Sequence, residues 1–173
     1  MVDAKVTLEI VTPNGAVLRE QVDDVQAPGQ SGQFGVLPGH LPLLAALRTG
    51  ILTLHKGAEE KSLAVGDGFV EVRDDRVLVL TDKVMAREKV DLVKARLELK
   101  EVQEQLDVYD GPPGAAQWLE LVAREHWAAV QLELCGDPPI ATRRPLERSG
   151  ANGAKASAVE TETQEDAPAP LRG

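Results

Sequence analysis

Apolar and polar residues alternate in short runs over the first half of the chain. Val6, Leu8 and Ile10 are separated by polar residues, and this alternation predicts a half-buried strand. A turn signal at residues 13–15 predicts a hairpin into a second strand over about residues 17–25. The same pattern predicts four more strands, over residues 50–55, 61–65, 68–72 and 76–81. Many short strands with turn signals between them are typical of a sandwich of two packed antiparallel sheets.

The last of these strands is apolar on both of its faces. Residues 76–81 read RVLVLT, which predicts a strand that lies between a second sheet and some other cover. Because only five residues of the chain are aromatic, we expect a core of Leu, Val, Ile and Ala, with Phe69 in a core strand.

The apolar period changes from two to three and four at about residue 87. The stripe that results consists of Leu92, Ala95, Leu99, Val102 and Leu106. It predicts an amphipathic helix. The segment DGPPG at residues 110–114 is expected to end that helix, and a second apolar stripe predicts another helix over about residues 115–134. Two helices with a short link form an antiparallel hairpin.

The end of the chain lacks the apolar residues that a core needs. Residues 149–173 are mostly Ala, Gly, Ser, Thr, Glu and Pro, a composition typical of disorder. The sequence therefore predicts a β-sandwich domain over residues 1–86, an α-helical hairpin domain over residues 87–135 and a disordered C-terminal tail over residues 136–173.

Charge and hydropathy exclude two classes of partner. With 19 Lys and Arg against 28 Asp and Glu, the net charge of −9 has the wrong sign for binding phosphate backbones, so no nucleic acid partner is expected. No apolar run approaches the roughly 18 residues that a membrane span needs, so direct membrane insertion is not expected.

The segment of residues 28–44 is unusually rich in Gly and Pro. Four Gly and three Pro surround apolar side chains that a plain surface loop would not need. One interpretation is a pair of tight turns with Phe34, Val36 and Leu37 in the core. The other is a shaped segment that presents its side chains to a partner.

Two runs of this sequence resemble a known family. The run PGQSGQFGVLPGHLPLLAALRTGIL, followed by KSLAVGDGFVEVRDDRVLVLTD and a two-helix segment, is similar to the ε subunit of F-type ATP synthases, called δ in mitochondria. The resemblance covers about residues 4–134. It implies an amino-terminal β-sandwich, a carboxy-terminal helical hairpin and a non-catalytic role that requires no cofactor.

The resemblance also implies partners and a location. Family members belong to the central stalk, which rotates with the γ subunit and the membrane-embedded c-ring and couples proton-driven rotation to ATP synthesis. In many bacteria the hairpin can extend toward the catalytic α/β head and inhibit ATP hydrolysis. For this chain the resemblance implies a peripheral position at the cytoplasmic face of a bacterial plasma membrane.

The glycine-rich segment looks like the part of the family that docks onto the polar loops of the c-ring. The contacts that this implies are Gln33, Phe34, His40, Leu41 and Pro42. Related sequences often have an acidic residue where Gln33 stands, so hydrogen bonds and shape would replace a salt bridge here. A metal or catalytic role for His40 is disfavoured, because His55 and His126 lie far away in sequence without ligand spacing.

The first helix begins with a segment similar to the family's nucleotide-sensing motif. The residues that this implies are Asp91, Lys94, Arg96 and, on the second helix, Arg124, with ATP as a regulatory ligand. Lys94 stands where the motif has Arg, and lysine lacks the planar fork of a guanidinium. The alternative, which we favour, is an ion pair between Asp91 and Lys94 on a solvated helix face.

The second helix has few of the basic residues that are associated with inhibition of ATP hydrolysis in the family. Inhibitory hairpins in the family carry several basic residues, whereas this helix sets Glu120, Glu125 and Glu133 against Arg124. We therefore expect the hairpin to serve mainly in stalk packing, with weak or absent ATP-controlled inhibition.

Two other classes of function compete with the stalk subunit. One is a freestanding β-sandwich module that binds a peptide or a sugar through the glycine-rich segment. An enzyme ranks last, because the sequence has no recognisable Ser-His-Asp or Cys-His signature, Walker motif or metal-ligand cluster.

Overall fold

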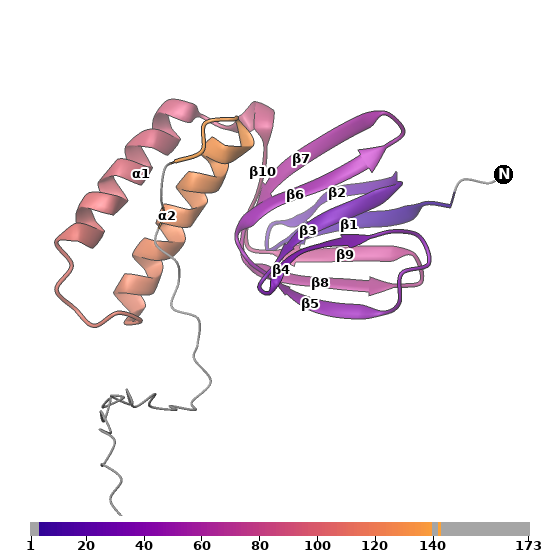
Figure 1. The fold of residues 1–173 in the computed structure, drawn as a ribbon, viewed down its shortest axis with the longest axis horizontal. Helices are drawn as coiled ribbons and strands as arrows, with labels where there is room; N and C mark the ends of the chain where they lie inside the picture. Colours follow the sequence, from indigo (N-terminus) through magenta and orange to yellow (C-terminus); the bar gives the residue numbers. More distant parts are fainter. Residues whose placement is uncertain (1–3, 140–141, 143–173) are drawn as a thin grey trace, which may run out of the picture.

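The computed structural model describes residues 4–139 and residue 142. The strands are β1 (Val6–Thr12), β2 (Gly15–Val22), β3 (Asp24–Gly29), β4 (Gly32–Val36), β5 (Leu43–Leu47), β6 (Gly50–Lys56), β7 (Glu59–Val65), β8 (Gly68–Arg73), β9 (Arg76–Thr81) and β10 (Val84–Ala86). A 3₁₀ turn (Arg87–Lys89) leads into the helices α1 (Leu92–Asp107) and α2 (Ala116–Leu134). Figure 1 shows the strands on one side and the helical hairpin on the other.

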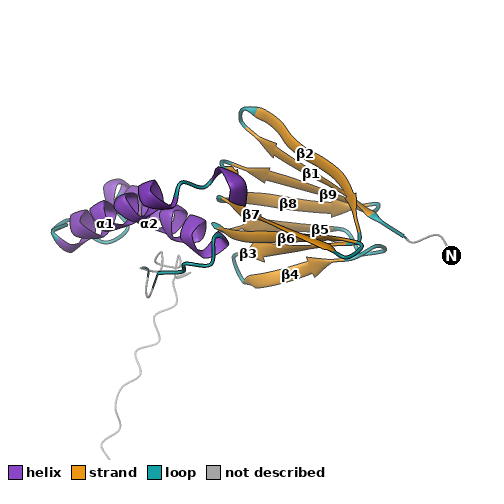
Figure 2. Ribbon diagram, turned by 90° about the horizontal axis from the view of Figure 1, so that it is seen from above, coloured by secondary structure: helices purple, strands orange, loops and turns teal. Residues whose placement is uncertain are grey.

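The strands form a β-sandwich, as predicted. Hydrogen bonds connect them in the order β10-β7-β6-β3-β5-β8-β9-β1-β2, and β4 pairs with the remaining side of β3. The two layers of the sandwich are connected where β3 meets β5, and the single residue pair there is Gly29 with Leu47. Figure 2 shows the resulting layers edge-on. One pair differs from the antiparallel expectation, because β1 runs parallel to β9.

Side chains from both layers fill the space between them. Val6, Leu8 and Ile10 of β1 are fully buried, which confirms the strand predicted from their alternation. Phe69 is different: it lies on β8, as expected, but it points outward and is 55% exposed. The correction follows from the period of two, because Val70 and Val72 occupy the inward positions of this strand.

The strand predicted over residues 17–25 is in fact two strands. β2 ends at Val22 and β3 begins at Asp24, with the chain turning at Asp23. The Asp23 carboxylate accepts hydrogen bonds from the Lys5 ammonium and from the Gly57 N–H, the latter at 2.6 Å. These bonds hold the corner, and the apolar pattern alone does not reveal them.

The helices follow the predicted stripe. The Asp91 carboxylate accepts a hydrogen bond of 3.0 Å from the Lys94 N–H and so caps the first turn of α1. The four residues of the stripe that are buried on α1 are Ala95, Leu99, Val102 and Leu106. They face α2 in an antiparallel hairpin, which confirms the helical prediction.

The hairpin lies folded against one end of the sandwich (Figure 1). Trp127, Val130 and Leu134 of α2 pack against Ile51 of β6 and Ala64 of β7. The Lys83 ammonium lies 5.5 Å from the centre of the Trp127 ring, within the range of a cation–π contact. The apolar contacts and this cation fix α2 on the sandwich.

Beyond α2 the structure describes only a short part of the predicted tail. Residues 136–139 follow the helix, and the Asp137 N–H donates to the Leu132 carbonyl. The rest of the tail predicted to be disordered lies outside the described residues, except for residue 142.

Candidate docking surfaces

The β3–β4 hairpin carries the first two predicted contact residues. Phe34 is half-buried and packs on the sandwich core, whereas Gln33 is exposed. A Cβ atom on Gly29 would lie 3.0 Å from the Phe34 ring and 2.8 Å from the Gly32 carbonyl oxygen. Gly29 is therefore required for the ring to fold back over the turn.

The surface of this hairpin is polar and mostly uncharged. The Gln33 side-chain amide donates a hydrogen bond of 3.3 Å to the Gln26 side-chain oxygen. The tip adds Gln30 and Ser31, both exposed. A hollow open to solvent lies beside them and is lined by Asp24, Gln26, Gln33, Phe34, Gly35 and Leu37. The hairpin thus offers hydrogen-bond donors and acceptors to a polar partner.

The loop of residues 37–42 carries the other three predicted contacts. Gly39 has a φ of 78°, and its N–H donates a hydrogen bond of 2.6 Å to the Asp75 carboxylate in the β8–β9 turn. The Nδ1 atom of His40 donates to the Leu41 carbonyl at 2.7 Å. This local bond gives His40 a role in shaping the loop. The Leu41 side chain in this loop is 79% exposed.

The five predicted contact residues lie in two groups along the chain, one on β4 and one in the loop after it. Gln33 and Phe34 lie near the start of β4, and His40, Leu41 and Pro42 lie beyond its other end. One interpretation of the glycine-rich segment places Phe34, Val36 and Leu37 in the core. Val36 is fully buried, Phe34 is partly buried and Leu37 is exposed. The segment therefore contributes both to the core and to the surface.

An apolar surface continues from this loop across the sandwich. It consists of Leu44 and Ala46 of β5, Phe69 of β8, and Leu78 and Leu80 of β9, and we call it the outer apolar face. Ala46 pairs with Phe69, and Phe69 pairs with Leu80. These pairings place the three side chains in adjacent positions on one face of the sheet, and in the next row Glu71 lies between Leu44 and Leu78.

The outer apolar face is open to solvent. Leu44 is 72% and Leu80 is 44% exposed. The sequence predicted that residues 76–81 would be covered on both faces, and the second sheet covers only one of them through Val77 and Val79. Sequence reasoning missed Leu44 as a member of this face, because its pairing with β8 is not visible in the sequence.

The two arginines among the predicted nucleotide-sensing residues are paired with carboxylates of the same chain. The Arg96 guanidinium donates to the Asp137 carboxylate at 2.7 and 2.9 Å. The Arg124 guanidinium lies 2.7 Å from the Glu98 carboxylate. Sequence reasoning missed both acidic partners, which are 41 and 26 residues away from their arginines.

Asp91 and Lys94 lie three residues apart at the start of α1, and their contact is not the side-chain ion pair of the alternative interpretation. The Asp91 carboxylate is placed on the Lys94 N–H, as a helix cap, and the Lys94 side chain is exposed. This pair has a structural role at the start of α1.

Comparison with known proteins assigns the chain to a family. Residues 5–87 match the family model of the ATP synthase Delta/Epsilon chain, beta-sandwich domain. ATP synthase epsilon chain 2 of Syntrophotalea carbinolica is 40% identical over 132 residues, which cover 76% of this chain and 94% of the relative. The chain belongs to the ATP synthase epsilon chain family. The epsilon chain of Anaeromyxobacter sp. (strain K) is 46% identical over 100 residues, which cover 58% of this chain and 76% of the relative.

Solved structures share the fold of this epsilon chain family member. A chain of the Euglena gracilis mitochondrial ATP synthase, in an OSCP/F1/c-ring assembly, superposes with a TM-score of 0.59 at 23% identity, covering 78% of this chain and 79% of that one. A chain of the Tetrahymena thermophila mitochondrial ATP synthase central stalk and c-ring gives 0.54 at 15% identity, covering 76% and 96%.

Family membership confirms the resemblance seen in the sequence. The epsilon chain is a non-catalytic subunit of the ATP synthase complex, so the enzyme alternative is excluded. Among residues 4–139 and 142, no group of three His, Cys, Asp or Glu side chains is placed to hold a metal ion. No helix in the described part of the chain is long and apolar enough to cross a membrane.

Proposed function

We propose that this chain is a central-stalk subunit of a bacterial F-type ATP synthase, where it binds the γ subunit and the c-ring and couples their rotation to ATP synthesis. The observation that carries the proposal is the outer apolar face. The sandwich has a complete core of its own, yet Leu44, Phe69 and Leu80 stay exposed on the outward side of β5, β8 and β9. Exposed apolar patches of this kind mark protein interfaces.

The γ subunit is the partner that we assign to the outer apolar face. A subunit that rotates as one body with γ needs a lasting interface, and lasting interfaces have apolar centres with polar rims. Phe69 supplies an aromatic anchor. Glu71, which pairs with Leu44 and with Leu78, places a carboxylate inside the face, and Arg73 lies farther along the same strand. The loop carrying Leu41 and Pro42 adjoins this face and extends the contact.

The c-ring is the partner that we assign to the β3–β4 hairpin. The polar loops of a c-ring call for hydrogen-bonding groups, and Gln33 with the neighbouring Gln30 and Ser31 offers them without a net charge. Phe34 supports this tip from below by packing on the core. His40, Leu41 and Pro42 follow the opposite end of β4, and we do not assign them to the c-ring contact.

Purification of the complex tests the proposal. The full chain is tagged and expressed in its native source, where we place it at the cytoplasmic face of the membrane. It is expected to co-purify with the γ, c, α and β subunits after the membranes are solubilised in detergent. The freestanding-module alternative gives a different result, because the chain then elutes alone as a monomer. Recovery of the chain without any other ATP synthase subunit contradicts the stalk function.

We also propose that the hairpin packs in the stalk and exerts little ATP-controlled inhibition. Arg96 is paired with Asp137, just beyond α2, and Arg124 with Glu98 of α1, so a nucleotide phosphate would have to displace one of these carboxylates. The packing of Trp127 on the sandwich further favours the folded position. ATP as a regulatory ligand is therefore not needed for function.

Deleting residues 87–173 is expected to change the ATP hydrolysis rate of the assembled enzyme by less than about twofold. The reason is that a hairpin held on the sandwich exerts no brake that its removal could lift. Hydrolysis by the purified complex is compared with and without the deletion, with equal subunit content as the control. A several-fold rise in rate would overturn this part of the proposal.

A further inference from the structure

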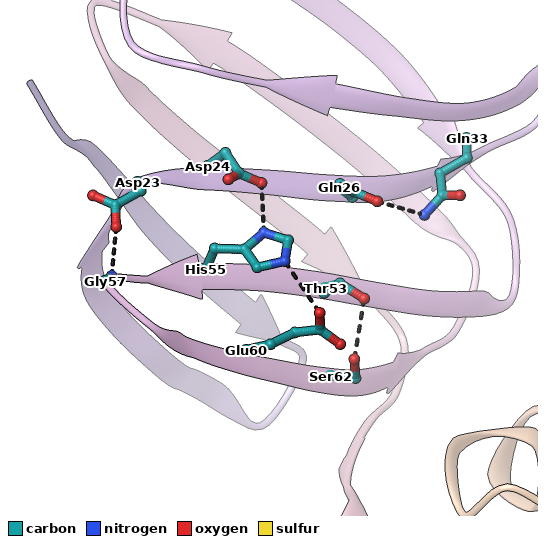
Figure 3. A network of polar contacts seen from close by, with 9 residues as sticks. All are labelled: Asp23, Asp24, Gln26, Gln33, Thr53, His55, Gly57, Glu60 and Ser62. Carbon is teal, nitrogen blue, oxygen red and sulfur yellow. Dashed lines mark hydrogen bonds and ion pairs between the residues drawn. The ribbon is translucent and has the colours of Figure 1, made fainter.

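His55 lies in a row of three charged side chains that crosses three strands. It stands on β6, directly opposite Asp24 of β3 on one side and Glu60 of β7 on the other. Its Nδ1 atom is 2.8 Å from the Asp24 carboxylate, and its Nε2 atom is 3.3 Å from the Glu60 carboxylate. Figure 3 shows the ring between its two partners.

The two contacts of His55 require two protons on one ring. A neutral imidazole carries a single N–H, and its other nitrogen is an acceptor. A carboxylate is also an acceptor, so only the imidazolium can donate to Asp24 and Glu60 at once. Loss of one proton therefore breaks one of the two bonds.

The nearby contacts at the same end of the sandwich do not depend on this proton. The Asp23 N–H donates to the His55 carbonyl at 2.8 Å. The Asp23 carboxylate holds the Gly57 N–H and the Lys5 ammonium. The Lys5 and Gly57 hydrogen bonds lower the pKa of Asp23, so this carboxylate stays ionised where histidine titrates.

We propose that His55 is a proton-controlled clasp between β3, β6 and β7. In the charged form it joins Asp24 and Glu60 across the central strand. In the neutral form the proton stays on Nδ1, where the contact with Asp24 is shorter, and Glu60 is released. The tip of the β6–β7 hairpin then loosens, while the Asp23 contacts keep it attached.

The direction of the pH effect follows from the surroundings of the ring. The charged groups that face His55 are Asp24 from β3, Glu60 from β7 and Asp23 from the β2–β3 corner. The hydrogen bond that His55 donates to Asp24, followed by the one that it donates to Glu60, raises the pKa of His55 above its ordinary value. As long as both carboxylates are ionised, the clasp is thus fully formed below about pH 6.5, and it is lost as the pH rises through the higher folded-state pKa.

Histidine NMR on the isolated full chain tests the clasp. Across a pH titration, two-bond ¹H–¹⁵N spectra are expected to give the Nδ1–H tautomer for neutral His55. The His55 midpoint is expected to fall in Glu60→Gln and to fall farther in Asp24→Asn, with the ring of His40 as an internal reference outside the row. A neutral Nε2–H tautomer, or a midpoint unchanged in Glu60→Gln, would overturn the proposal.

Hydrogen exchange measures the loosening itself. After correction for intrinsic chemistry, protection of the amides in residues 57–61 is expected to fall by about two- to fivefold through the His55 titration, the range of an exposed ion pair. The matched control is His55→Gln, whose protection is expected to stay flat over the same pH range. An equal fall in that variant contradicts the proposal. Because these measurements need no partner subunit, they do not depend on the stalk function.

Discussion

Replacing Leu44 and Phe69 together by Ala is expected to weaken binding of this chain to the γ subunit by about 100-fold, or about 3 kcal/mol. Both side chains belong to the outer apolar face, where Ala46 and Leu80 are adjacent to Phe69. Large apolar groups at the centre of an interface contribute most of its affinity, and each truncation removes their buried area.

The same double variant is expected to fold normally. Leu44 and Phe69 are largely exposed in the chain alone, so the free energy of unfolding changes by no more than about 0.5 kcal/mol for each substitution. Titration of γ with the labelled full chain gives the affinity, and thermal unfolding checks the fold. Val108→Ala is the matched control, because Val108 is 81% exposed at the C-terminal end of α1, off the sandwich. Unchanged affinity in the double variant, or an equal loss in the control, would remove this face as the γ interface.

Replacing Trp127 by Ala is expected to detach the helical hairpin from the sandwich at a cost of about 2–3 kcal/mol in docking free energy. The substitution removes the largest side chain between α2 and the strands, together with its contact to Lys83. Val130 and Leu134, with Ile51, Ala64, Met85 and Val90, remain in this cluster, and we expect their smaller contact area to be insufficient to hold two helices in one position.

Rotational diffusion of the two parts measures this detachment. In the parent chain, ¹⁵N relaxation is expected to give one correlation time for sandwich and hairpin, and in Trp127→Ala two different ones. Trp118→Ala is the control, because Trp118 packs inside the hairpin beside Tyr109, in a cluster separate from the one on the strands. A single correlation time in Trp127→Ala, or two in the control, contradicts the role assigned to Trp127.

Much of the fold could be predicted because burial in this chain is periodic. The alternation in β1 and the stripe of Ala95, Leu99, Val102 and Leu106 both record which side chains face a core. These patterns are local, so they identified both helices, the fold class and the strands β1, β6, β7, β8 and β9. They merged β2 with β3 and did not predict β4, β5 or β10. Family resemblance then supplied the functional class that no catalytic motif indicates.

The candidate site was less predictable because it depends on pairing between distant segments. Periodicity shows that Phe69 and Val70 face opposite sides of β8, but it does not show which side the second sheet covers. In the same way, Arg96 resembles part of a nucleotide-sensing motif in the sequence, and only the structure shows that its guanidinium is paired with Asp137. Positions that serve interfaces therefore carry the weakest local signal.

The parallel pairing of β1 with β9 has a consequence for how the chain folds. Glu9 and Arg76, which form an ion pair across these strands, are 67 residues apart in the sequence. Contacts of such high contact order close a long loop and form slowly. On the ribosome, β1 has no partner on this side until the ninth strand emerges, whereas the helical hairpin, whose contacts are local, can form soon afterwards. Closure of the sandwich by its first strand is thus expected to be the rate-limiting step in the maturation of this subunit.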